Sequence, residues 1–81
     1  MRDMLLPVNL NVKGRLCVIL GGGPVANRKC RKLLEHGARV RVVSPDFSGG
    51  DGAWAFADID RQERPYGEDA LVGAFLAIAA T

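Results

Sequence analysis

A chain of 81 residues has room for one small domain, and its composition of 48% hydrophobic and 25% charged residues is typical of a globular chain. The net charge of +2 is too small to indicate a nucleic-acid partner or an anionic membrane surface. No apolar stretch reaches the roughly 18 residues of a membrane span, and the first residues lack the apolar core of a signal peptide. We therefore expect one cytoplasmic domain over residues 1–81, with no nucleic-acid or membrane partner.

The two cysteines and the single histidine do not form a recognisable metal motif. Cys17 falls in an apolar run and Cys30 in a helical pattern, so both are expected to be buried small hydrophobic residues in a reducing compartment. His36 stands beside the expected end of a helix, and no carboxylate partner for a general-base role can be placed near it. We therefore predict no metal site.

The sequence is organised around a strand, a glycine turn and a helix. An apolar run at residues 16–20 stops at Gly21, Gly22 and Gly23. A helical pattern begins at Pro24, where the missing N–H removes no helical hydrogen bond. Because this strand is apolar on both faces, it is expected to lie in a parallel sheet covered by helices.

The glycine turn matches the pattern G-x-G-x-x-G/A through Gly21, Gly23 and Ala26. The first glycine permits a tight turn, the second lets the backbone approach a pyrophosphate, and Ala26 allows close packing of helix on strand. Amides near Pro24 and Val25 would then face the phosphates at the helix N-terminus. The pattern predicts dinucleotide binding; the alternative is a plain turn that needs glycine for its geometry.

The rest of the chain continues an alternation of strands and helices. The first helix is expected to end near His36, before Gly37. The remaining predicted elements are an edge strand or extended arm at 8–12, strands at 39–43, 58–62 and 74–80, one helical turn at 53–56 and a short helix at 67–72. This order predicts an α/β fold with a parallel, Rossmann-like sheet that is part of an NAD(P)-binding domain. Strand 74–80 would be an exposed, aggregation-prone edge unless another segment covers it.

The end of the second strand bears on the choice between NAD and NADP. Ser44 stands where the ribose-binding acid is usual, and Pro45 and Asp46 follow it. Ser44 or the backbone of the next two residues would contact the adenosine ribose, although Asp46 is equally well an ordinary loop residue. Arg39 and Arg41 would favour a 2′-phosphate, but strand arginines are more often solvated. The sequence thus favours NAD without excluding NADP.

Several segments resemble the precorrin-2 dehydrogenase family, which also forms the N-terminal dehydrogenase and ferrochelatase module of siroheme synthase. The stretch GGGPVANRK, which matches GGGxVAxRK, is much more specific than a bare glycine motif. The resemblance runs through nearly the whole chain and is carried by residues 4–10, 13–15, 21–29, 32–38, 42–45 and 77–81.

This resemblance implies NAD⁺-dependent oxidation of precorrin-2 to sirohydrochlorin, with Fe²⁺ insertion in some members. It implies pyrophosphate contacts along residues 21–25, adenosine contacts at residues 45 and 46, and a nicotinamide side formed by Ala79, Ala80 and Thr81. Arg28 and Lys29 are candidates for binding the carboxylates of the tetrapyrrole, and exposed helix residues are the alternative interpretation. With Ser44 added, the predicted cofactor-binding residues are Gly21, Gly22, Gly23, Pro24, Val25, Ser44, Pro45, Asp46, Ala79, Ala80 and Thr81.

The resemblance also implies what the 81 residues lack. The family's catalytic aspartate directly follows the threonine matched by Thr81, so no catalytic residue is assigned. The family's dimerisation and substrate-binding regions would also follow residue 81, and the full-length protein is expected to be a homodimer. We expect this chain alone to bind NAD without oxidising precorrin-2. A nucleotide-sensing Rossmann-like domain without redox chemistry is the alternative, and the residues after Thr81 would distinguish the two.

Overall fold

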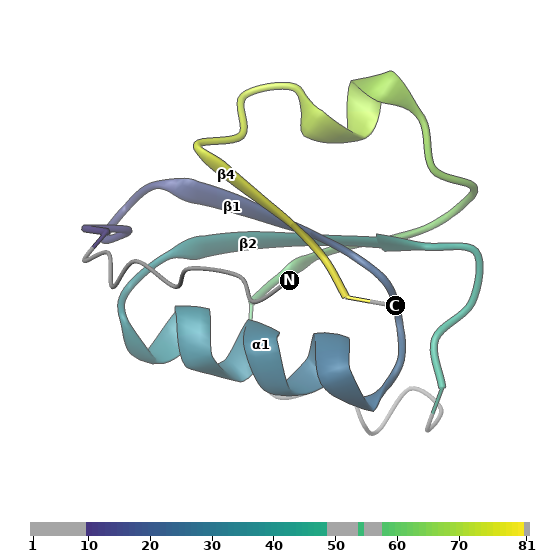
Figure 1. Ribbon diagram of the computed structural model, residues 1–81, viewed down its shortest axis with the longest axis horizontal. Helices are drawn as coiled ribbons and strands as arrows, with labels where there is room; N and C mark the ends of the chain where they lie inside the picture. Colours follow the sequence, from purple (N-terminus) through teal and green to yellow (C-terminus); the bar gives the residue numbers. More distant parts are fainter. Residues whose placement is uncertain (1–9, 49–53, 55–57, 81) are drawn as a thin grey trace, which may run out of the picture.

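The computed structural model describes residues 10–48, 54 and 58–80 (Figure 1). Within these residues, strands alternate with two helical segments. The elements in chain order are β1 (Leu16–Leu20), α1 (Pro24–Glu35), β2 (Arg39–Ser44), β3 (Asp60–Glu63), the 3₁₀ helix η1 (Glu68–Leu71) and β4 (Leu76–Ala79).

The strands form one parallel sheet in the order β3-β2-β1-β4. The central strand β1 pairs with β2 and β4, so that Ile19 lies between Val42 and Ile78. Helix α1 covers one face of the sheet and η1 lies over the other (Figure 1). This arrangement confirms the predicted α/β, Rossmann-like fold.

Alternate residues of β1 enter two separate apolar cores, which is why the strand is apolar throughout. Cys17 and Ile19 pack on the α1 side together with Cys30 of the helix. Val18 packs on the η1 side against Val43 of β2, with Ala70 of η1 in the same cluster. The two cysteines are free and buried, as predicted. Burial raises the pKa of the Cys30 thiol to about 11, although nearby Arg31 lowers it, and the group is a neutral thiol at physiological pH.

Helix α1 ends where the sequence predicted. Gly37 has a φ of +83°, a left-handed conformation that glycine adopts without strain. Its carbonyl accepts a hydrogen bond of 2.9 Å from the N–H of Gly14, in the turn that leads into β1. The helix end is thereby tied to the start of the sheet.

Three predicted elements differ in detail from the structure. The third strand lies at Asp60–Glu63, slightly later than expected, and the short helix is 3₁₀. The last strand covers Leu76–Ala79 and alternates between half-buried and exposed residues, because it is an edge of the sheet formed by the described residues. Of the edge strand or arm predicted at 8–12, residues 10–12 are described and belong to no strand, and Val12 among them is buried. Of the turn predicted at 53–56, only Trp54 lies among the described residues, and it is buried.

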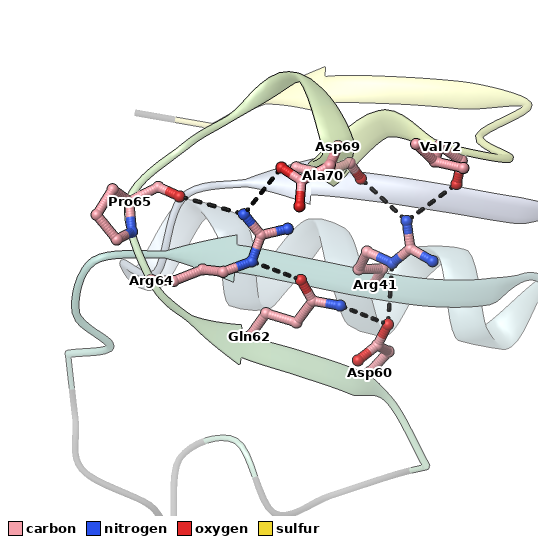
Figure 2. A network of polar contacts seen from close by, with 8 residues as sticks. All are labelled: Arg41, Asp60, Gln62, Arg64, Pro65, Asp69, Ala70 and Val72. Carbon is pink, nitrogen blue, oxygen red and sulfur yellow. Dashed lines mark hydrogen bonds and ion pairs between the residues drawn. The ribbon is translucent and has the colours of Figure 1, made fainter.

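Arg41 joins β2 to both β3 and η1 (Figure 2). Its Nε donates to Oδ2 of Asp60 at 2.9 Å, and its Nη1 donates to the carbonyls of Ala70 and Val72, each at 3.0 Å. The guanidinium therefore satisfies carbonyl groups at the end of η1 while it pairs with a carboxylate of the neighbouring strand. This contact holds the second helical segment against the sheet.

We predict that Arg41→Met lowers the free energy of unfolding by about 1–3 kcal/mol, because the carbonyls of Ala70 and Val72 lose their donor. Amide hydrogen exchange in η1 should accelerate more than exchange in α1. The matched control is Arg39→Met at an exposed position of the same strand. Equal effects of the two substitutions on urea unfolding and on exchange would contradict this role for Arg41.

Candidate functional site

A cleft of about 360 Å³ opens at the carboxyl edge of the sheet, where β1 and β2 end and α1 begins. The strand order departs from the chain order here, since β1 is followed in sequence by β2 but also borders β4. Ligands of open parallel sheets bind at such positions. The cleft is lined by Gly21, Gly22, Gly23, Pro24, Val25, Ser44, Pro45, Asp46, Tyr66 and Ala80.

Gly21 connects the ends of three strands. Its N–H donates to the carbonyl of Val43 at 3.0 Å, and its φ of +144° is unfavourable for a residue with a side chain. A Cβ at this position would overlap the backbone carbonyl of Ala80, just after β4. The first glycine is therefore required by the close approach of the backbone as well as by the turn.

Gly22 and Gly23 differ in their surroundings. A Cβ on Gly22 would overlap the carbonyl of Asp46 and would lie 2.9 Å from Oγ of Ser44. A Cβ on Gly23 would have Oγ of Ser48 as its nearest neighbour, at 4.0 Å. Gly22, at the variable position of the motif, is thus constrained by packing, while Gly23 leaves space at the cleft.

The N-terminus of α1 presents backbone donors to this cleft. Gly23 is the N-cap residue, and no side chain caps the helix. Pro24 has no N–H, and the N–H of Asn27 already donates to the carbonyl of Gly23 at 3.0 Å. The amides of Gly23, Val25 and Ala26 and the positive end of the helix dipole are suited to an anion such as a phosphate. A nucleotide diphosphate fits this donor set.

The end of β2 supplies the second wall of the cleft. Ser44 is only 3% exposed and lies against Gly22, and its carbonyl accepts the N–H of Arg64 at 2.8 Å. Pro45 and Asp46 are exposed beside it. The structure therefore brings the predicted residues at the end of β2 next to the glycine turn.

Other predicted residues lie apart from the cleft or outside the described part of the chain. Ala80 lines the cleft, whereas Ala79 is exposed at the end of β4 and Thr81 is not among the described residues. Arg28 is exposed and Lys29 half-buried on α1, and the cleft lining includes neither residue.

Tyr66 also lines the cleft, and it is not among the cofactor-binding residues predicted from the sequence. It follows β3, whose carboxyl end reaches the same edge as the other strands because the sheet is parallel. The position of Tyr66 shortly after a strand of a parallel sheet was the feature of the sequence that could have identified it. Tyr66 is 48% exposed, and Nη1 of the nearby Arg64 contacts Oδ1 of Asp69 at 3.3 Å across the turn (Figure 2).

The described residues hold no group of three or more metal-ligating side chains. His36 caps the far end of α1, with Nδ1 2.8 Å from the carbonyl oxygen of Lys32. Among the helices described, none is both long and apolar enough to cross a membrane.

The chain matches, over residues 8–81, a protein-family model described as "Putative NAD(P)-binding". It is 44% identical over 79 residues to a siroheme synthase of Nitrosomonas eutropha and 44% identical over 77 residues to one of Escherichia coli O1:K1 / APEC. These alignments cover 93% and 94% of the chain but only 16% and 17% of the two relatives. The solved structure of "SirC, precorrin-2 dehydrogenase" matches with a TM-score of 0.80 and 32% identity, over 95% of this chain and 39% of that one.

We predict that the three glycines respond differently to alanine. Gly21→Ala and Gly22→Ala should each cost about 1–3 kcal/mol or more of stability, because the new Cβ overlaps backbone atoms. Gly23→Ala should lower the free energy of unfolding by less than about 1 kcal/mol, since a Cβ at this position would have open space. Thermal unfolding of the three variants measures this order, and a Gly23→Ala variant as unstable as Gly21→Ala would contradict it.

Proposed function

This chain belongs to the NAD(P)-binding family whose model covers residues 8–81, and from that premise we propose that it is the NAD-binding part of a precorrin-2 dehydrogenase. The full-length protein would oxidise precorrin-2 to sirohydrochlorin in siroheme biosynthesis. The observation that carries the proposal is the glycine turn at the N-terminus of α1, in a chain similar to siroheme synthases and to a precorrin-2 dehydrogenase.

When bound, NAD⁺ supplies a hydride acceptor: precorrin-2 gives up a hydride and a proton, and the products are sirohydrochlorin, NADH and H⁺. The described residues contribute to binding. Residues 21–25 are proposed to hold the pyrophosphate, with backbone amides as donors in place of a cationic side chain. Pro24 cannot donate, so the pyrophosphate would depend on the neighbouring amides.

The adenosine is proposed to lie beside Ser44, Pro45 and Asp46, with Tyr66 completing this side of the cleft. NAD is favoured over NADP by two features. Arg41 already donates to Asp60 and to the carbonyls at the end of η1, and Arg39 lies at the opposite end of β2. The exposed carboxylate of Asp46 would instead repel a 2′-phosphate.

The nicotinamide is proposed to lie toward the end of β4, near Ala79, Ala80 and Thr81. Support comes from Ala80, which lines the cleft directly opposite the backbone of Gly21. Arg28 and Lys29, on the turn of α1 that follows the cleft residues, are proposed to bind carboxylates of precorrin-2. Their separation from the described cleft is consistent with a substrate that approaches over the helix rather than through the dinucleotide site.

The remaining properties of the full-length protein stay predictions from the sequence. They are a cytoplasmic location, a homodimer without nucleic-acid or membrane partners, and in some family members the insertion of Fe²⁺ as a second substrate. The chain spans only 16% and 17% of the siroheme synthases that it matches, and these properties are therefore proposals about the whole protein.

We predict that the 81-residue chain binds NAD and that Gly23→Asp weakens this binding by about tenfold or more, because a carboxylate would face the pyrophosphate. NADP should bind about tenfold more weakly than NAD, and Asp46→Asn should reduce that difference. Isothermal titration of both cofactors measures these effects, with Asp58→Asn, an exposed residue outside the cleft, as the control. Unchanged affinity in Gly23→Asp would overturn the placement of the pyrophosphate.

We further expect no NADH to form when this chain alone is mixed with NAD⁺ and precorrin-2, whereas a protein that continues past Thr81 with the family's aspartate should form it. NADH absorbance distinguishes the two. Formation of NADH by the 81-residue chain would contradict the expected need for that aspartate. A longer protein that binds NAD but does not oxidise precorrin-2 would instead support a nucleotide-sensing function.

A further inference from the structure

We propose that Ser48 is a positioning residue, which orients the peptide between Gly22 and Gly23 so that the Gly23 N–H donates to the pyrophosphate. This inference rests on the dinucleotide binding proposed above. It extends the site to a residue that does not itself line the cleft.

Ser48 makes two hydrogen bonds to one backbone oxygen. Its N–H donates to the carbonyl of Gly22 at 2.9 Å, and its hydroxyl donates to the same oxygen at 3.3 Å. The described chain has no cis peptide bond, so the Gly23 N–H points away from the Gly22 carbonyl and thus away from Ser48. Gly22 and Gly23 both line the cleft, and the geometry therefore directs this N–H toward it.

The orientation of this peptide is important because the helix start has few donors. Pro24 has no N–H, and Gly23 has no side chain that could cap the helix. A peptide between two glycines also has more rotational freedom than any other, since neither residue carries a Cβ. Holding the Gly22 carbonyl from outside the cleft removes that freedom before the ligand arrives, which lowers the entropy cost of binding.

Ser48 is itself held by the core on the α1 side. The indole N–H of Trp54 donates to the carbonyl of Ser48 at 3.3 Å, and Trp54 is buried. Its ring packs edge-to-face against Phe47, with 5.2 Å between the ring centres. The guanidinium of Arg61 lies 4.8 Å from the centre of the Phe47 ring. These contacts hold Phe47 and Ser48 in place beside the glycine turn.

The test compares Ser48→Ala and Ser48→Thr with the unaltered 81-residue chain, and Asp58→Ala, an exposed residue before β3, is the control. Binding of NAD, ADP-ribose and adenosine is measured by chemical-shift titration, in which the Gly23 amide is followed. Ser48→Ala should lower the affinity for NAD and for ADP-ribose by about threefold to tenfold, because one of the two hydrogen bonds to the Gly22 carbonyl is lost. Adenosine, which has no phosphate, should bind unchanged.

Ser48→Thr keeps the hydroxyl and should restore the affinity for NAD, and in the unaltered chain the Gly23 amide should shift on binding NAD but not adenosine. If Ser48→Ala lowers the affinities for adenosine and for NAD equally, Ser48 only stabilises the loop, and the inference is overturned. Unchanged NAD binding in Ser48→Ala would overturn it as well. An unaltered chain that fails to bind NAD would overturn the proposed function itself, which is a distinct result.

Discussion

The structure depends on the close approach of the glycine turn to the ends of two neighbouring strands. The backbone of Gly21 lies against the carbonyl of Ala80 after β4, and Gly22 lies against Ser44, the last residue of β2, and Asp46. No side chain could occupy these positions without moving backbone atoms. The residues that make these contacts also line the cleft. The close approach of the glycine turn therefore determines both the fold at this edge and the position of the cleft, and α1 begins directly after the turn.

The two faces of the sheet are packed in different ways. On the α1 side, the helix and Trp54 pack a larger apolar core, and the segment after β2 is tied to the glycine turn through Ser48. On the η1 side, the apolar cluster is smaller, and Arg41 supplements it with hydrogen bonds to backbone carbonyls (Figure 2). The glycine turn, where the pyrophosphate site is proposed, is thus supported from the side with the more extensive packing.

The predictions from sequence succeeded where local pattern and tertiary environment agree. The strand at 16–20, the helix from Pro24 and the stop at Gly37 each have a strong local signal, and the structure confirms them. The weak alternation near residue 60 predicted a third strand at 58–62, whereas β3 lies at Asp60–Glu63. A strand of only four residues carries little periodic signal, so its boundaries are poorly predicted. The role of Arg41 could not be read from the sequence, since its partners Asp60, Ala70 and Val72 lie 19 to 31 residues away.

A glycine turn between a buried strand and a helix, with Ser44, Pro45 and Asp46 at the end of the next strand, can be predicted from residue order alone, because hydrophobic pattern and glycine spacing are local properties. The folded chain was needed to show which glycine packs against which strand, that Tyr66 lines the cleft, and that Ser48 holds the Gly22 carbonyl. Those contacts depend on the register of parallel strands, which brings distant loops to one edge. No pattern within a single segment contains that information.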